Sequence, residues 1–303
     1  MLDKLLTEQS NPASSGIDAK STVDILRIMN QEDRRVADCV TVEIPQIAKA
    51  VDAIVAAMDA GGRLFYIGAG TSGRLGVLDA SECQPTFSVP PDLVQGIMAG
   101  GDKALSTSVE TIEDDPAIGI RDLRARGFTS KDVLCGIAAS GRTPYVLGAI
   151  AEARRLGAVT IGLSCTPDSE LAREADIAIT PVSGPEIVAG STRLKAGTAT
   201  KLVLNMLTTA TFIRRGCVFG NLMVNVQPRN RKLIDRACRI IAEAAGIERD
   251  RALEFLEASG NQVRIAILMA RAGLTREQAE QRLAVAGGRI SAALESASAN
   301  DRS

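Results

Sequence analysis

The sequence predicts an α/β fold in which helices cover both faces of a parallel sheet. Short apolar, β-rich stretches recur along the chain, segments with helical spacing separate them, and two of the stretches end in turns rich in glycine and hydroxyl residues. Strands that alternate with helices at this spacing are typical of a parallel sheet buried on both sides. The expected strands lie at 63–67, 94–98, 132–138, 158–163 and 176–180.

Helices are expected before, between and after these strands. Residues 1–20 are polar and indicate an extended arm, and Ser21 is a candidate cap for the helix that follows. The first strand runs through a glycine-rich turn into a helix that begins near Ser72. Other segments with helical spacing are 22–38, 45–60, 144–156 and 192–215.

From about residue 229 onward the pattern is helical only. Four or five short helices are expected, and 249–283 resembles a compact three-helix module of the ubiquitin-associated kind. The chain is therefore divided into an N-terminal arm and helix (1–44), an α/β domain (45–225) and a C-terminal helical module (226–303). The expected breaks between the C-terminal helices are Gly246, Gly260, Gly273 and Gly287-Gly288.

Composition excludes several classes of function. The 303 residues are 46% hydrophobic and 23% charged, which favours a sizeable core over disorder. The formal net charge of -1 gives no basic excess, so neither a nucleic acid nor a membrane is expected as a partner. A phosphate ligand is still compatible with this charge, because backbone N–H groups and hydroxyls can bind one.

The chain contains no histidine and only 3% aromatic residues. The lack of histidine removes histidine-based triads, histidine general bases and almost all zinc catalysis, so acid–base chemistry must use carboxylates, lysine, cysteine or tyrosine. The six cysteines form no CxxC pair, and buried reduced thiols are favoured over a disulfide framework or a metal site.

The sequence suggests neither export nor a membrane span. The first ten residues have no apolar core of a signal peptide, and the longest apolar stretches are interrupted before 18 residues. We therefore expect a cytoplasmic protein.

The first turn, Gly68-Ala69-Gly70-Thr71-Ser72-Gly73, also fits the pattern GxGxxG. A dinucleotide site typically also has an acidic residue about 20 residues further on, at the end of a second strand. Residues 88–92 do not resemble such a strand end. The hydroxyls of Thr71 and Ser72 at a helix start point instead to a small phosphate monoester, although a plain tight turn stays an alternative.

A second hydroxyl-bearing turn, Ser140-Gly141-Arg142-Thr143, follows the strand at 132–138. Turns at the carboxyl ends of neighbouring parallel strands converge on one crevice, where open α/β sheets bind ligands. Two such turns together predict a joint phosphate site.

Two glutamates are candidates for acid–base chemistry. Glu82 lies near the end of the helix that follows the first turn, which Pro85 is expected to terminate, and Glu113 lies in an acidic segment ahead of Pro116. Two carboxylates in different environments can divide acid and base roles. The alternatives are an exposed helix end for Glu82 and a solvated acidic loop for Glu113.

The segment 186–198 opens the long helix, and Gly190-Ser191-Thr192 fits its N-cap. Arg193 and Lys195 near a helix start are unfavourably placed for the helix dipole. Their position suggests an anionic ligand or a partner carboxylate, with exposed first-turn cations as the alternative.

Several blocks together resemble the N-acetylmuramic acid 6-phosphate etherases. They are TEQSNPASSGID (7–18), GAGTSGRLGVLDASECQPTF (68–87), GIAASGRTPYVLGAI (136–150), GSTRLKAGTATKLVLNM (190–206) and NLMVNVQPRNRKLIDRA (221–237). The resemblance runs from Thr7 to about Ile290, with one small departure at Gln84, where this family usually has proline.

The resemblance implies a sugar-isomerase (SIS) domain, flavodoxin-like in its sheet, and a metabolic enzyme of amino-sugar recycling. It implies that N-acetylmuramic acid 6-phosphate and water give N-acetylglucosamine 6-phosphate and D-lactate by elimination and then hydration. Glu82 matches the proton donor and Glu113 the second catalytic carboxylate. No metal and no redox cofactor is implied.

The same resemblance suggests residues that hold the substrate and implies a homodimer. SIS domains often complete their clefts across a subunit interface, so a second chain is expected to contribute. The 6-phosphate is expected at Thr71, Ser72, Ser140 and Thr143, and the sugar or its lactyl carboxylate at Ser191, Thr192 and Lys195.

Two other functions compete with this one. A sugar-phosphate-binding regulator similar to the glucokinase regulatory proteins shares these blocks, but those chains carry two SIS domains. An aldose–ketose isomerase or a sugar-phosphate-sensing transcription factor is the third alternative. A transcription factor would need a basic helix-turn-helix, and the helical segment 22–60 is not basic.

Overall fold

A computed structural model describes residues 6–107 and 111–300, and the side chains of 296–300 are left out of the description. The chain forms two compact units. The first holds the residues up to Glu82 together with Pro90–Thr208, and the second holds Cys83–Val89 and the residues from Thr209 onward. The three-part division expected from the sequence stays a prediction.

The first unit is built on a five-stranded parallel sheet with the order β2-β1-β3-β4-β5. This is the flavodoxin-like order, in which the chain reverses direction across the sheet between β1 and β3. All five expected strands are confirmed, within one or two residues at their ends. They are β1 (Leu64–Gly68), β2 (Val94–Met98), β3 (Val133–Ile137), β4 (Val159–Leu163) and β5 (Ile177–Ile179).

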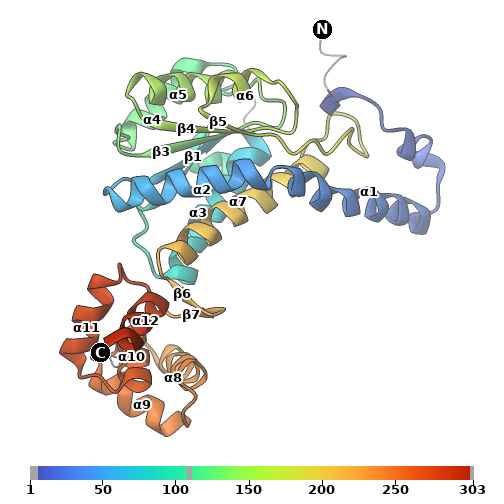
Figure 1. The fold of residues 1–303 in the computed structure, drawn as a ribbon. Coiled ribbons are helices and arrows are strands. Elements are labelled where there is room, and N and C mark those ends of the chain that lie inside the picture. Colours follow the sequence, from blue (N-terminus) through green and yellow to red (C-terminus); the bar gives the residue numbers. More distant parts are fainter. Residues whose placement is uncertain (1–5, 108–110, 301–303) are drawn as a thin grey trace. The chain divides into compact units, whose positions relative to one another are not determined.

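Helices lie on both faces of the sheet, which confirms the predicted three layers (Figure 1). One face carries α4, α5 and α6, and the other carries α2, α3 and α7. The strands are apolar on both sides because both are covered. The helix bounds are α2 (Ile44–Asp59), α3 (Gly70–Phe87), α4 (Pro116–Ala125), α5 (Pro144–Arg155), α6 (Glu170–Glu174) and α7 (Lys195–Arg214).

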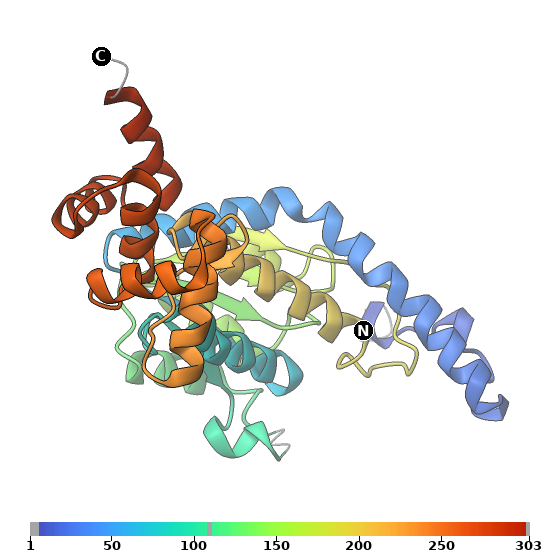
Figure 2. The ribbon, with the colours of Figure 1, turned by 90° about the horizontal axis from the view of Figure 1, so that it is seen from below.

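The N-terminal segment reaches the sheet through two consecutive helices. Helix α1 (Thr22–Val42) is capped by the Ser21 side chain, as expected, and Glu43 joins it to α2 (Figures 1 and 2). Residues 6–20 are not extended throughout, because they form short 3-10 turns at Leu6–Glu8, Pro12–Ser14 and Ile17–Ala19. Residues 6–14 are referred to below as the arm.

Helix α4 was not predicted, although its start carries a clear signal. Asp115 is its N-cap, and Pro116 follows at the first helical position. The helix packs closely on α5 through a glycine: a Cβ at Gly119 would lie 1.9 Å from the Tyr145 carbonyl oxygen. Only glycine permits this approach, and it fixes the segment before α4 beside the start of α5.

Two helix ends differ from the prediction. Helix α3 does not stop at Pro85 but continues to Phe87, because a proline near the end of a helix removes one N–H without preventing a last turn. Helix α7 begins at Lys195, so Gly190-Ser191-Thr192 is not its N-cap. The Glu186 carboxylate takes that role by accepting the backbone N–H groups of Lys195 and Ala196, both at 2.9 Å.

The second unit is helical apart from a two-stranded hairpin, β6 (Val218–Phe219) and β7 (Leu222–Met223), which was not predicted. Within the described residues, five helices follow the hairpin and are separated at the expected glycines, and their buried faces form one apolar cluster around Ile241, Leu256 and Leu268. The helices are α8 (Arg231–Ala245), α9 (Arg249–Ala258), α10 (Val263–Ala272), α11 (Arg276–Val285) and α12 (Ile290–Asn300).

Two other expectations concern the whole chain. All six cysteines are free thiols, and all except Cys39 are buried. Among residues 6–107 and 111–300, none of the helices is both long enough and apolar enough to cross a membrane.

Candidate functional site

The two hydroxyl-bearing turns emerge side by side from the sheet. Strands β1 and β3 are paired neighbours, and the last residue of β1, Gly68, lies opposite Ile137 at the end of β3. Each turn leads into a helix: Thr71 and Ser72 lie in the first turn of α3, and Ser140 precedes α5. This carboxyl edge of β1 and β3 is also where the strand order reverses, the usual ligand crevice of such sheets.

The first turn brings the start of α3 against the end of β1. A Cβ at Gly68 would lie 2.7 Å from the Gly73 nitrogen, so neither position accommodates a larger side chain without a shift. Gly70 has a φ of 53°, which favours glycine, and the space beside it is open. The result is a helix N-terminus with open space beside Gly70 and with the hydroxyls of Thr71 and Ser72 in its first turn.

The second turn is equally tight. Gly141 has a φ of 65°, and a Cβ there would lie 2.3 Å from the Ser169 hydroxyl oxygen. The Arg142 N–H donates to the Ser140 hydroxyl at 3.3 Å. Thr143 is the N-cap of α5 but makes no side-chain capping hydrogen bond, so its hydroxyl is not used by the helix. Both half-buried hydroxyls are therefore available to an anion at this helix start.

The head of α7 joins the two turns. A Cβ at Gly197 would lie 3.5 Å from the Thr71 methyl group and 3.4 Å from the Thr192 carbonyl oxygen, which places these two threonines beside the same point. The Cys165 thiol reaches the Ala196 carbonyl at 3.6 Å. The Cys165 N–H donates to the carbonyl of Ala139, the residue before Ser140, at 2.9 Å. The structure thus brings Thr71, Ser72, Ser140 and Thr143 to one edge of the sheet, with the backbone of Thr192 beside Thr71.

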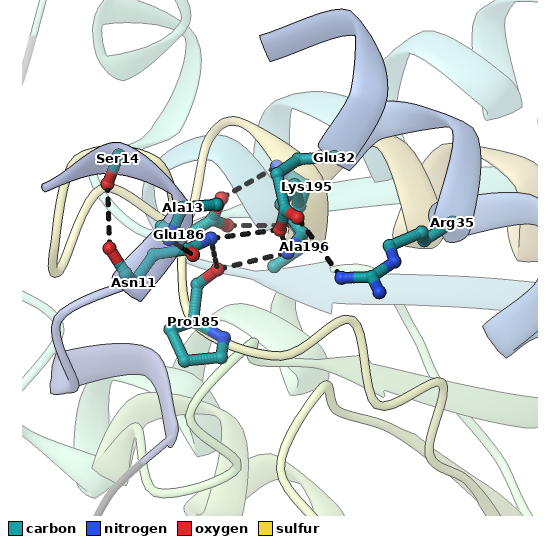
Figure 3. Close-up of polar contacts among 9 residues, drawn as sticks. All are labelled: Asn11, Ala13, Ser14, Glu32, Arg35, Pro185, Glu186, Lys195 and Ala196. Atoms are coloured by element: carbon teal, nitrogen blue, oxygen red, sulfur yellow. Dashed lines mark hydrogen bonds and ion pairs between the residues drawn. The ribbon is translucent and has the colours of Figure 1, made fainter. Parts of the chain in front are cut away.

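Lys195 does not lie with these hydroxyls. Its side chain is only 3% exposed, and its amine donates to Glu32 at 2.7 Å and to the Pro185 carbonyl at 3.0 Å (Figure 3). The hydrogen bond from Lys195 holds the pKa of Glu32 below its usual range, so the Glu32 carboxyl is ionised near neutral pH. Of the two explanations for a cation at this helix start, the partner carboxylate is the one present. Contact between this amine and a ligand stays a prediction.

Glu113 lies close to the second turn. Its carbonyl oxygen accepts the Tyr145 N–H at 3.0 Å, two residues after Thr143. Glu113 is half-buried and is followed by α4, whose first residues pack on α5. The unpredicted helix α4 therefore fixes the position of this glutamate beside the start of α5.

Glu82 lies at the other end of α3. It follows Ser72 by ten residues, and at 1.5 Å per residue the helix separates the two by about 15 Å. Glu82 is exposed and borders a pocket of about 170 Å³ between α3 and α7, which Lys201 and Asn205 also line. Within one chain, most of the length of α3 therefore separates Glu82 from the hydroxyls of Thr71 and Ser72.

Asp79 lines the same pocket and was not among the predicted site residues. Burial raises its pKa to about 6, although the Tyr66 hydroxyl donates to it at 2.9 Å and the Thr208 hydroxyl at 3.2 Å. A carboxylate with a strongly raised pKa in a pocket is a feature of functional sites and also of structural polar networks. Asp79 could have been found from the sequence, because it lies three residues before Glu82 on one helix and therefore on the same helix face.

Another cavity, of about 400 Å³, lies beside β2 and α4 and holds none of the predicted site residues. Gly96, Met98, Asp102 and Arg121 are among the residues that line it. Its volume alone does not make it a better candidate than the carboxyl edge, where tight turns, hydroxyls and helix starts converge.

Comparison with known proteins decides the family. The chain is 59% identical over 266 residues to the N-acetylmuramic acid 6-phosphate etherase of Jannaschia sp. (strain CCS1), covering 88% of this chain and 84% of that protein. It is 54% identical to the etherase of Serratia proteamaculans (strain 568), covering 97% of this chain and 99% of that protein. The chain belongs to the N-acetylmuramic acid 6-phosphate etherase family.

Two domain profiles match within this etherase-family chain. The SIS domain matches residues 114–210, and the glucokinase regulatory protein N-terminal SIS domain matches residues 46–154. A candidate phosphosugar isomerase involved in capsule formation from Bacteroides fragilis has a similar structure, with a TM-score of 0.51 and 21% identity over 64% of this chain and 91% of that one. That structure supports the SIS fold and nothing further. Because the etherase relatives match over most of the chain, the regulatory alternative is not favoured.

Proposed function

We propose that this protein cleaves the D-lactyl ether of N-acetylmuramic acid 6-phosphate, producing N-acetylglucosamine 6-phosphate and D-lactate. The observation that carries the proposal is the pair of hydroxyl-lined helix starts at the carboxyl ends of β1 and β3, in a chain 59% identical to an etherase. Helix N-termini with short hydroxyls suit a phosphate monoester. Thr71, Ser72, Ser140 and Thr143 are assigned to the 6-phosphate.

The chemistry needs one base and one acid. In the open-chain aldehyde the proton at C2 is acidic, and a base removes it. The electron pair forms a C2–C3 double bond while the C3–O bond breaks, and an acid protonates the departing lactate oxygen. Water then adds its hydroxyl to C3 and a proton to C2, which restores the saturated sugar. Glutamates can carry both roles in a chain that has no histidine.

Glu113 and Glu82 are the proposed pair, with Glu82 as the proton donor. Glu113 lies near the second hydroxyl turn of its own chain, whereas Glu82 lies about 15 Å from Ser72 along α3. That separation exceeds the distance from a sugar's phosphate to its C3, so the Glu82 that acts on a bound sugar is proposed to come from a second copy of the chain. The proposal thus includes a homodimer, and its location is the cytoplasm.

The first test is release of D-lactate from N-acetylmuramic acid 6-phosphate by the purified protein. Release well above the rate in enzyme-free buffer is expected, and its absence would reject the proposed activity.

The second test separates a one-chain site from a two-chain site. Glu82→Gln and Ser72→Ala should each lower turnover by about 10²-fold or more, the scale of a lost acid–base group or positioning contact. If each site takes Glu82 from a partner, denaturing and refolding the two variants together creates dimers with one intact site, and part of the activity returns. Mixtures as inactive as the separate variants, with mixed dimers verified by mass, would contradict the two-chain site.

A further inference from the structure

The arm, α1 and the head of α7 meet in a buried polar cluster (Figure 3). Asn11, Glu32, Glu186 and Lys195 come from four separate segments, and none is more than 8% exposed. Charged groups are rarely buried this far unless they are paired, because removing them from water is costly. A cluster of this kind fixes one relative arrangement of its segments better than it adds stability.

A closed set of four hydrogen bonds forms the first anchor. Asn11 and Lys195 each donate to the same two acceptors, the Glu32 carboxylate and the Pro185 carbonyl. The distances to Glu32 are 2.9 Å from Asn11 and 2.7 Å from Lys195, and both distances to Pro185 are 3.0 Å. Because both donors share the same two acceptors, moving the arm would disturb the loop after β5 and the start of α7 together.

A second anchor lies five residues further along the same loop. The Gly190 N–H donates to the Thr7 carbonyl at 2.9 Å. Gly190 has a φ of 77°, and a Cβ there would lie 3.2 Å from a Glu8 carboxylate oxygen, so the loop follows the arm closely at this point. Ser191 and Thr192 lie directly between this anchor and Lys195.

We infer that the arm and Glu32 form a strap that positions Ser191 and Thr192, and that Lys195 is a positioning residue within it. The inference rests on the proposed function, in which these two hydroxyls border the sugar. The segment that carries them has no regular secondary structure of its own, so its geometry depends on side-chain anchors. A displacement of about 1 Å at a positioned group can cost as much as 10²-fold in rate.

The test variant is Asn11→Ala, which removes two donors but leaves the Glu32–Lys195 pair in place. It should raise KM for N-acetylmuramic acid 6-phosphate about tenfold or more, with a smaller change in kcat. The reason is that displaced Ser191 and Thr192 would lose contacts that they make equally with the bound substrate and with the transition state, and such a loss raises KM. Amide hydrogen exchange in a peptide covering 187–194 should become faster. Arg27→Ala, which breaks an exposed ion pair on α1, is the control and should change neither readout.

A double variant shows whether the arm acts through the two hydroxyls. In a Ser191→Ala, Thr192→Val background, Asn11→Ala should raise KM no further, since coupled residues give non-additive effects. A lowered melting temperature with unchanged KM would indicate a merely structural role and overturn the inference, as would additive effects. Glu32→Gln is the second variant if Asn11→Ala folds poorly. Amide hydrogen exchange can be measured in an inactive protein, so it tests the strap even if the protein releases no D-lactate.

Discussion

Two kinds of helix start occur at the carboxyl edge of the sheet. The start of α7 is closed, because the buried Glu186 carboxylate accepts the N–H groups of Lys195 and Ala196. The starts of α3 and α5 differ: open space lies beside Gly70, and α5 has no side-chain cap. Each helix N-terminus favours a negative charge. The protein supplies that charge itself at α7, and we propose that a ligand supplies it at α3 and α5.

The comparison also explains why Lys195 tolerates its position. A cation in the first turn of a helix is unfavourable, but here two carboxylates surround it: Glu186 on its backbone N–H and Glu32 on its amine. The dipole and the cation are thus both neutralised by buried residues of the same chain. A free phosphate would find the Lys195 amine and the N–H groups of Lys195 and Ala196 already paired.

The largest expected effect comes from closing the start of α3 in the way that α7 is closed. Ser72→Asp places a carboxylate where the 6-phosphate is proposed to bind. Like charges in contact cost several kcal/mol, so kcat/KM should fall about 10³-fold. The fold should persist, because aspartate is favourable in the first turn of a helix.

Thr275→Asp provides a matched control for that substitution. Thr275 caps α11 in the C-terminal unit, so the variant adds the same charge at a helix start outside the proposed site, and activity should be unchanged. Full activity in Ser72→Asp would mean that the start of α3 does not hold the phosphate.

Much of this comparison could be predicted from local sequence, and part of it could not. The turns at 68–73 and 140–143 could be predicted because their glycines and hydroxyl residues lie within a few positions of each other in the sequence. The closure of α7 depends on Glu186, nine residues before Lys195, and on Glu32, 163 residues away. Local capping rules therefore favoured Gly190-Ser191-Thr192 over the true cap, Glu186. Helix α4 was missed even though Asp115 and Pro116 mark its start.

A second prediction contrasts the buried Glu186 with Asp79, a half-buried carboxylate that accepts hydrogen bonds from hydroxyls in place of a helix start. Burial raises the pKa of Asp79 from 3.8 to about 6. The folded state therefore binds its proton more tightly than the unfolded state, so this group's stability contribution is complete below pH 4 and is lost as the pH rises to about 6. A shift of this size corresponds to about 3 kcal/mol.

Asp79→Asn removes that titration and keeps an oxygen for Tyr66 or Thr208. The difference in unfolding free energy between the variant and the original protein should move in favour of the variant by about 2.4 kcal/mol between pH 4 and pH 7, because part of the full effect is already lost at pH 4. Urea unfolding at several pH values measures it. A difference independent of pH would show that Asp79 keeps an ordinary pKa.

The smallest expected effect comes from weakening the closure of α7. Glu186→Gln keeps one acceptor but turns an amide group toward the other backbone N–H, so one buried donor loses its partner. The free energy of unfolding should fall by about 2 kcal/mol, the scale of a lost cap together with an unsatisfied buried group. Glu170→Gln in the first turn of α6 is the control: its carboxylate is exposed, so its loss should cost only a few tenths of a kcal/mol. Equal losses in the two variants would mean that the buried carboxylate does no more for α7 than an exposed charge does for α6.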